Sequence, residues 1–219
     1  MLPFNQLLTA TALVVLASGV ACKSDSGVTG PTSLEGQYRG TLAGESSPSL
    51  SASLALTVAP STTGTITPVG AAPITVTGTY VASTKAVTLS GGGYTIAGTI
   101  DDTGKLLGTY TRSTTQGSVV AYQHTTTNPV TVYCGTYTGG AAGIWNTLVR
   151  GSSLSGVYDN VDGSDGYFLG TVNGSSVSIT EISASPGATA SGTISGTTMS
   201  GTLSGGGVAY ATWTSDTSC

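Results

Sequence analysis

Few residues of this chain carry side chains that could perform acid–base or nucleophilic chemistry. His124 is the only histidine, and Asp and Glu together number 10 in 219 residues. Serine is abundant, yet there is no Gly-x-Ser-x-Gly motif, and no carboxylate stands at an informative spacing from His124. A catalytic triad would require three such residues to meet in space, whereas a solvated loop histidine is the simpler interpretation. We therefore expect a protein that is not an enzyme and needs no cofactor.

The densest group of carboxylates lies between Asp159 and Gly166, in the sequence DNVDGSDG. Hard cations such as Ca²⁺ take oxygen ligands, so a calcium site is one interpretation of this segment. The spacing differs from that of an EF-hand, because Val161 takes the third position and Gly170 the twelfth. Asp-Gly pairs between apolar strands are typical of hairpin turns. We favour the turn, and the sequence shows no Cys/His cluster typical of a metal site.

Two of the three cysteines, Cys134 and Cys219, flank the second half of the chain. Cys134 lies on the first strand expected there, and Cys219 follows the last. In a closed up-and-down barrel the first and last strands are neighbours, so a disulfide between them would lock the closure. Such a bridge would constrain the unfolded chain by about 4–5 kcal/mol in the entropy model. The alternatives are two reduced thiols or pairing between molecules.

A repeated unit, Gly-Thr-apolar followed by a Ser-Gly turn, predicts the elements that position these residues. It is densest in residues 191–214, SGTISGTTMSGTLSGGGVAYATWT, and recurs along the chain. Apolar residues alternate with Thr and Ser at a period of two, which is typical of strands with one buried face. Glycine falls repeatedly on the apolar face, where we expect it to ease strand bending rather than to clear room for a ligand.

The strand pattern predicts an all-β antiparallel up-and-down meander, arranged as two tandem small barrels. We expect a first β-module at 34–124, a linker at 125–130 and a second β-module at 131–219, each module with about eight short strands. The alternative is one larger continuous barrel or a sandwich. The opening strands, with Gly36-x-Tyr38 and Gly135-x-Tyr137, resemble the Gly-x-aromatic start of calycin barrels such as lipocalins and avidins. That resemblance implies architecture and no chemistry.

The N-terminus carries an apolar run, Leu7 to Val20, at the place of a signal-peptide core. Residues 18–22, SGVAC, follow it and resemble the lipobox of bacterial lipoproteins, although Gly19 stands where that family usually has Leu. The resemblance implies a signal peptide at 1–21 and lipidation of Cys22. The residues after the cysteine lack any periodicity, so we expect a flexible tether at 22–33. Lys23 after the cysteine is associated in that family with the outer membrane. An ordinary cleaved secretory signal is the alternative.

The low content of charged residues limits the partners that this protein could bind. Charged residues make up only 7% of the chain, against about 25% in ordinary soluble domains, and the net charge is -4. Nucleic acid is therefore not an expected partner, because it requires a basic face. We expect a lipid-anchored exported protein of the cell envelope with a structural or interaction role. The alternative is a β-barrel that binds a small apolar ligand, and several inward tyrosines would support it: Tyr38, Tyr80, Tyr94, Tyr110, Tyr137 or Tyr210.

Overall fold

The computed structural model describes residues 31, 33–44, 52–69, 71–183 and 185–216. The expected signal peptide at 1–21, the lipidation residue Cys22, most of the tether at 22–33 and Cys219 therefore lie outside the described residues. Within the described ranges, no helix has the length and apolar character needed to cross a membrane.

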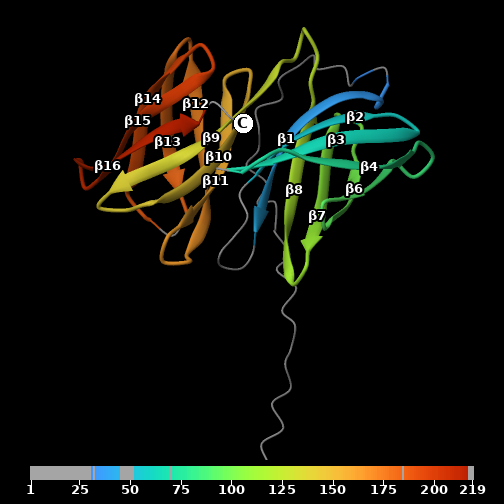
Figure 1. The fold of residues 1–219 in the computed structure, drawn as a ribbon. Helices are drawn as coiled ribbons and strands as arrows, with labels where there is room; N and C mark the ends of the chain where they lie inside the picture. Colours follow the sequence, from blue (N-terminus) through green and yellow to red (C-terminus); the bar gives the residue numbers. More distant parts are fainter. Residues whose placement is uncertain (1–30, 32, 45–51, 70, 184, 217–219) are drawn as a thin grey trace, which may run out of the picture.

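Sixteen antiparallel strands form two closed barrels, shown side by side in Figure 1. The first barrel consists of β1 (Gly36–Gly44), β2 (Ala52–Val58), β3 (Ser61–Pro68), β4 (Ile74–Val81), β5 (Ala86–Gly91), β6 (Tyr94–Ile100), β7 (Lys105–Arg112) and β8 (Thr115–Gln123). The second consists of β9 (Val130–Gly139), β10 (Gly143–Arg150), β11 (Ser153–Asn160), β12 (Asp165–Asn173), β13 (Ser176–Ile182), β14 (Ala188–Ser195), β15 (Thr198–Gly205) and β16 (Val208–Asp216).

Each barrel closes because its last strand pairs with its first. β8 pairs with β1, and β16 pairs with β9, while every other strand pairs with its neighbours in sequence. Within each barrel, consecutive strands pair antiparallel, which is the arrangement of an up-and-down meander. The predicted all-β fold of two tandem small barrels is thus confirmed, and the alternatives of a single larger barrel or a sandwich are wrong.

The interior of the first barrel is a closely packed apolar core. Tyr38, Leu54, Ile96 and Leu106 are at most 1% exposed, and the Tyr38 hydroxyl donates a hydrogen bond of 2.8 Å to the carbonyl of Leu34. These residues come from strands on opposite sides of the barrel, so their contacts hold the whole closed sheet together.

Inward-facing glycines lie directly opposite aromatic residues on neighbouring strands. Tyr110 pairs in register with Gly117 in the first barrel. In the second barrel, Phe168 pairs with Gly156. An aromatic ring covers the space that a missing side chain leaves, and such cross-strand pairs stabilise sheets. The repeated glycines therefore seat aromatic rings, a role beyond the strand bending that their phase predicts.

The two barrels contact each other through β1 and β2 of the first and β9 and β10 of the second. Strand alternation turns Thr41 and Ser53 outward from the first barrel, yet each is only 7% exposed. Asn146 and Leu148, on the outer side of β10, are 0% and 4% exposed. The second barrel therefore shields one outer wall of the first from solvent.

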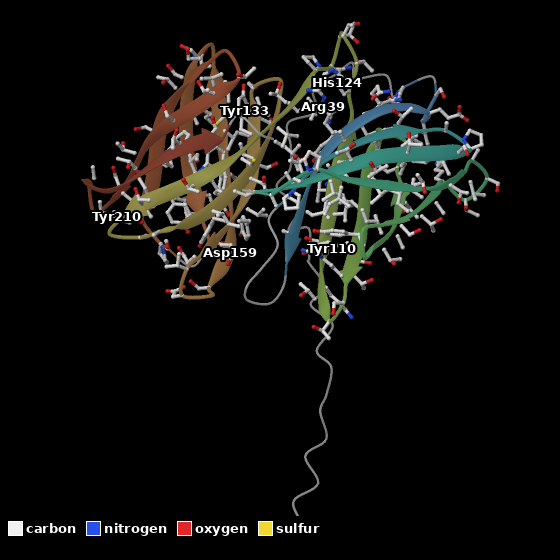
Figure 2. The ribbon with its side chains drawn as sticks, in the orientation of Figure 1. Arg39, Tyr110, His124, Tyr133, Asp159 and Tyr210 are labelled. Carbon is white, nitrogen blue, oxygen red and sulfur yellow. The ribbon has the colours of Figure 1, made fainter. Side chains whose placement is uncertain are left out.

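His124 lies in the segment that joins β8 to β9. Its backbone N–H donates to the carbonyl of Gln37 over 2.7 Å, and the Val130 N–H donates to its Nδ1 over 3.0 Å. Figure 2 shows His124 near Arg39, between the barrels. The histidine expected to be a solvated loop residue is instead half-buried and ties the end of one barrel to the start of the next.

Candidate ligand-binding site

The interior of the second barrel contains a cavity of about 120 Å³. Most of its core side chains keep some exposure: Tyr137 7%, Phe168 7%, Ile179 7% and Trp213 8%, whereas those of the first barrel are almost all at 0–2%. The core of the second barrel is thus less completely filled. The lining is predominantly apolar and aromatic, with a few polar residues: Tyr137, Ala141, Trp145, Thr147, Tyr158, Asn160, Phe168, Ile179, Ile182, Ser185, Ala190, Met199, Leu203, Tyr210 and Trp213.

One end of the barrel forms the mouth of this cavity. The half-buried lining residues Ala141, Asn160 and Ser185 lie in or beside the connections that follow β9, β11 and β13. In an up-and-down barrel these alternate connections all lie at the same end. Tyr210, labelled at the edge of the second barrel in Figure 2, belongs to this rim.

The two tryptophans of the chain form the aromatic centre of the site. Trp145 on β10 and Trp213 on β16 pack edge to face, with ring centroids 5.6 Å apart and an interplanar angle of 86°. This geometry places the positive edge of one ring against the negative face of the other, which is favourable for aromatic pairs. Both rings line the cavity, so the intrinsic tryptophan fluorescence of the protein originates here.

Two glycines hold the Trp213 ring in place. Gly192 pairs in register with Gly201, and Gly201 with Trp213, so the three residues form one row across β14, β15 and β16. A Cβ atom built on either glycine would lie 2.5 Å from Trp213 Cζ2, closer than packed atoms approach. The ring can occupy this position only because both side chains are absent.

A chain of hydrogen bonds organises the mouth. The Tyr137 hydroxyl donates to Asn160 Oδ1, and Asn160 Nδ2 donates to Ser164 Oγ over 2.8 Å. Ser164 in turn donates to Asp162 Oδ1 from both its Oγ, over 2.6 Å, and its backbone N–H, over 2.9 Å. The Tyr158 hydroxyl donates to the carbonyl of Ser183. Tyr137 and Tyr158 are therefore fixed by partners within the protein.

The acidic segment Asp159–Gly166 was expected to form either a hairpin turn or a calcium site, and the same hydrogen bonds bear on this choice. The bonds from Ser164 to Asp162 form a side-chain-stabilised turn between β11 and β12. In the described part of the chain, no three His, Cys, Asp or Glu side chains are grouped so that they could hold a metal ion. The turn is the interpretation that this geometry supports.

The two indole N–H groups at the cavity differ in their partners. Trp145 Nε1 donates to the carbonyl of Thr136 over 3.2 Å. Trp213 Nε1 is fully buried and has no acceptor among the described residues. A buried donor without an acceptor costs about 1–3 kcal/mol, so the packing of the Trp213 ring must offset this cost.

The cavity is electrically neutral. No Lys, Arg, Asp or Glu is among its lining residues. Burial raises the pKa of Tyr137 well above its ordinary value, and the nearby Tyr158, Asp159 and Asp162 add to this increase. Burial likewise raises the pKa of Tyr210. Both phenols keep their protons at neutral pH, and the site suits an uncharged molecule.

Only two of the tyrosines proposed to line a pocket do so. Tyr137 and Tyr210 line the cavity, whereas the other four belong to the packed core of the first barrel: Tyr38, Tyr80, Tyr94 and Tyr110. Trp145, Phe168 and Trp213 also line the cavity, but the alternation of apolar residues did not predict them as site residues. Their distribution was the available signal, because residues 34–124 contain no Trp or Phe at all.

Cys134 lies on the outer side of β9 and is completely buried. Its neighbour Tyr133 belongs to the core of the second barrel, so alternation turns Cys134 outward. In the register between β9 and β16, Cys134 pairs with Asp216, three positions before Cys219. The end of the described chain therefore passes beside Cys134.

The chain is similar to the crystal structure of isotype 1 transferrin binding protein B from serogroup B Neisseria meningitidis, with 12% sequence identity and a TM-score of 0.29. The match covers 77% of this chain and 52% of that chain, so this chain spans about half the length of the matched structure. No family model and no curated protein matches the sequence.

Proposed function

We propose that this chain is a non-catalytic, exported lipoprotein whose second barrel binds a small, uncharged, apolar ligand. The observation that supports binding is the neutral aromatic cavity in the second barrel, beside a first barrel whose core is closely packed. A concave apolar site with a few oriented polar groups is the usual form of a small-molecule site.

The volume of the cavity limits the size of the ligand. Drug-sized ligands occupy pockets of about 300–1,000 Å³, and an engineered apolar cavity of about 150 Å³ binds benzene. At about 120 Å³, the cavity suits one ring or a short branched chain. A long fatty acid would leave most of its length outside.

Titration with toluene tests this proposal. We expect the emission of Trp145 and Trp213 to change as toluene enters, because both rings line the cavity. A ligand at ten times its dissociation constant should stabilise the fold by about 1.4 kcal/mol, which a thermal melt measures.

A matched pair of variants identifies the site. Ala190→Leu adds side-chain volume to the cavity lining and should abolish both responses. Ala97→Leu adds the same atoms to an exposed position on β6 of the first barrel and should leave both unchanged. Toluene that stabilises the native protein and Ala190→Leu equally would refute a site in this cavity.

A protein partner in the envelope is the second candidate function. Tyr167 and Leu169, on the outer face of β12, are 49% and 41% exposed, and large apolar side chains gathered on a surface favour association. A photo-reactive residue at position 169 should cross-link to an envelope protein in intact cells. The same residue at position 202, an exposed threonine on β15, should not. Equal labelling at both positions would refute a specific partner at β12.

In this proposal the protein is anchored at the outer membrane by lipidation of Cys22, which follows a signal peptide at 1–21 and is the first residue of a tether at 22–33. The lipobox-like residues 18–22 support it. Intact-mass analysis of exported protein should show an acylated chain beginning at Cys22, and Cys22→Ala should yield a soluble or unprocessed form. A mature chain without lipid would exclude the anchor and leave ligand binding untouched.

A further inference from the structure

We infer that Tyr210 is the specificity-determining residue of the second barrel, because its ring covers the mouth of the cavity and excludes ligands whose chains would protrude. This inference rests on the proposed function and specifies its ligand as a compact, neutral, apolar molecule that fits wholly inside. Tyr210 is one of the residues that line the cavity, and Figure 2 shows it at the edge of the barrel.

A β-bulge changes the direction of Tyr210 on β16. Trp213 lines the cavity, so regular alternation would turn Tyr210, three positions earlier, to the outside. Leu203 of β15 pairs with Ala211, however, and the next residue of β15 pairs with Ala209. Tyr210 is therefore the extra residue of a bulge. Bulges are frequent beside functional sites, where they re-aim a side chain.

The contacts of the Tyr210 ring show that it lies on the inner side of the rim. Gly205 of β15 pairs in register with Ala188, two positions before the cavity-lining Ala190, so a side chain at Gly205 would point into the barrel. A Cβ atom built there would lie 3.1 Å from Tyr210 Cε1. On the other flank, a Cβ atom built on Gly140 would lie 3.3 Å from Tyr210 Cδ2. The ring thus lies over the rim between two glycines.

Tyr210 extends across the mouth and is held there less firmly than its neighbours. Burial raises its pKa, and the nearby Tyr158 adds to this increase, although β9 and β10 separate β16 from β11 around the barrel. Tyr158 and Tyr137 each donate a hydrogen bond from their hydroxyl, whereas Tyr210 donates none to another described residue. Its half-buried ring is therefore a part of the rim that can rotate to admit a ligand.

The covered mouth limits the length of the ligand. The cavity holds about 120 Å³, so a longer chain must leave through the mouth, where it would meet the Tyr210 ring. Displacing the ring would return apolar surface to water and forfeit part of the burial that drives binding. A compact ligand leaves the ring in place. We therefore expect selection by length as well as by polarity.

Toluene and 6-phenylhexan-1-ol test the inference, since they share one aromatic ring and only the second carries a long chain. Calorimetry should show that the native protein binds toluene more tightly. Tyr210→Ala should shift the ratio of the two affinities at least about tenfold toward the long ligand, which corresponds to about 1.4 kcal/mol. Tyr210→Phe keeps the ring and should keep the native ratio. Tyr167→Ala makes the same truncation at a residue that is 49% exposed on the outer face of β12, and should also keep it.

Quenching of tryptophan emission by acrylamide tests the covered mouth without a ligand. Trp145 and Trp213 line the cavity behind Tyr210, so Tyr210→Ala should increase quenching and Tyr167→Ala should not. Tyr210→Leu, which keeps an apolar side chain at the rim, should act in the same direction and serves if the alanine variant does not fold. Unchanged affinity ratios and unchanged quenching would overturn the inference, while toluene binding by the native protein would still support the proposed function. If neither ligand binds any of these proteins, both proposals fail.

Discussion

The guanidinium carbon of Arg150 lies 5.1 Å from the centroid of the Tyr122 ring. Arg150 ends β10 of the second barrel, and Tyr122 is on β8 of the first, so this cation–π contact joins the two barrels. Lys105 Nζ lies 5.7 Å from the same ring centroid. Tyr122 is thus a contact point between the modules and lies beside the connecting segment that begins at His124.

Arg150→Ala should weaken the coupling between the barrels. A cation–π contact contributes about 0.5–1 kcal/mol at exposed sites and about 2 kcal/mol when desolvated. Because Trp145 and Trp213 both belong to the second barrel, tryptophan emission follows its unfolding alone, and calorimetry follows both barrels. We expect the two transitions to separate in the variant.

Arg112→Ala is the matched control for this experiment. The Arg112 guanidinium lies at the same distance, 5.1 Å, from the Tyr94 ring, but both residues are in the first barrel. This variant should lower the stability of the first barrel without separating the transitions. Equal separation in both variants would show that Arg150 has no special part in joining the barrels.

Gly201→Ala should disturb the cavity. The added methyl group would meet the Trp213 ring and the Cα of Gly192, and overpacking of this kind costs about 1–3 kcal/mol. We expect a shifted tryptophan emission maximum and weaker toluene binding. Gly98→Ala, where the methyl group meets Leu107 of the first barrel, should destabilise that barrel and leave the emission maximum unchanged. An unaltered spectrum in Gly201→Ala would contradict the seating of the ring on this glycine.

We propose that Cys134 and Cys219 form a disulfide that locks the second barrel. The pairing of β9 with β16 and the register of Cys134 with Asp216 support it. Non-reducing peptide mapping should recover the two cysteines in one linked pair. Reduction should lower the melting temperature followed by tryptophan emission, since the bridge contributes at most about 4–5 kcal/mol. Recovery of both peptides as thiols from exported protein would refute the bridge.

Asp101 should make the first barrel sensitive to acid. Its Oδ1 accepts hydrogen bonds from the Thr103 N–H, over 2.8 Å, the Thr103 hydroxyl, over 2.6 Å, and the Lys105 N–H, over 3.0 Å. Burial alone would raise the pKa of Asp101, but these hydrogen bonds and the charge of Lys105 together hold it below its ordinary value. The stabilisation is therefore complete above the unfolded pKa of about 3.9 and is lost as the pH falls through the folded pKa.

Asp101→Asn tests this dependence. At neutral pH the variant should lose about 1 kcal/mol of unfolding free energy, a value that allows for solvent screening at an exposed carboxylate. The difference from the native protein should shrink below about pH 4. Asp102→Asn, which removes only a surface ion pair with Lys85, should change stability by less than about 0.5 kcal/mol. A pH-independent loss in Asp101→Asn would contradict the role of the charge.

Local sequence patterns determined the strands and their faces. Alternation in segments such as Tyr94–Ile100 predicts one buried and one exposed face, because successive side chains of a strand point to opposite sides. The hairpin turn at Asp101–Gly104 follows equally from local chemistry, since Asp accepts backbone hydrogen bonds and Gly104 adopts a φ of 77°. The division into modules at 34–124 and 131–219 remains a prediction that expression of each module would test.

Only the tertiary structure decided how the strands close and what the barrels enclose. Closure depends on pairs far apart in sequence, such as Thr136 with Thr214, whose register no local pattern encodes. The cavity depends on Trp213 lying across Gly192 and Gly201, a row that exists only after three strands align. The sequence alone determined that glycines and aromatic residues share the inner face. Packing between strands decides which aromatic ring covers which glycine. It also decides where a cavity remains inside the second barrel.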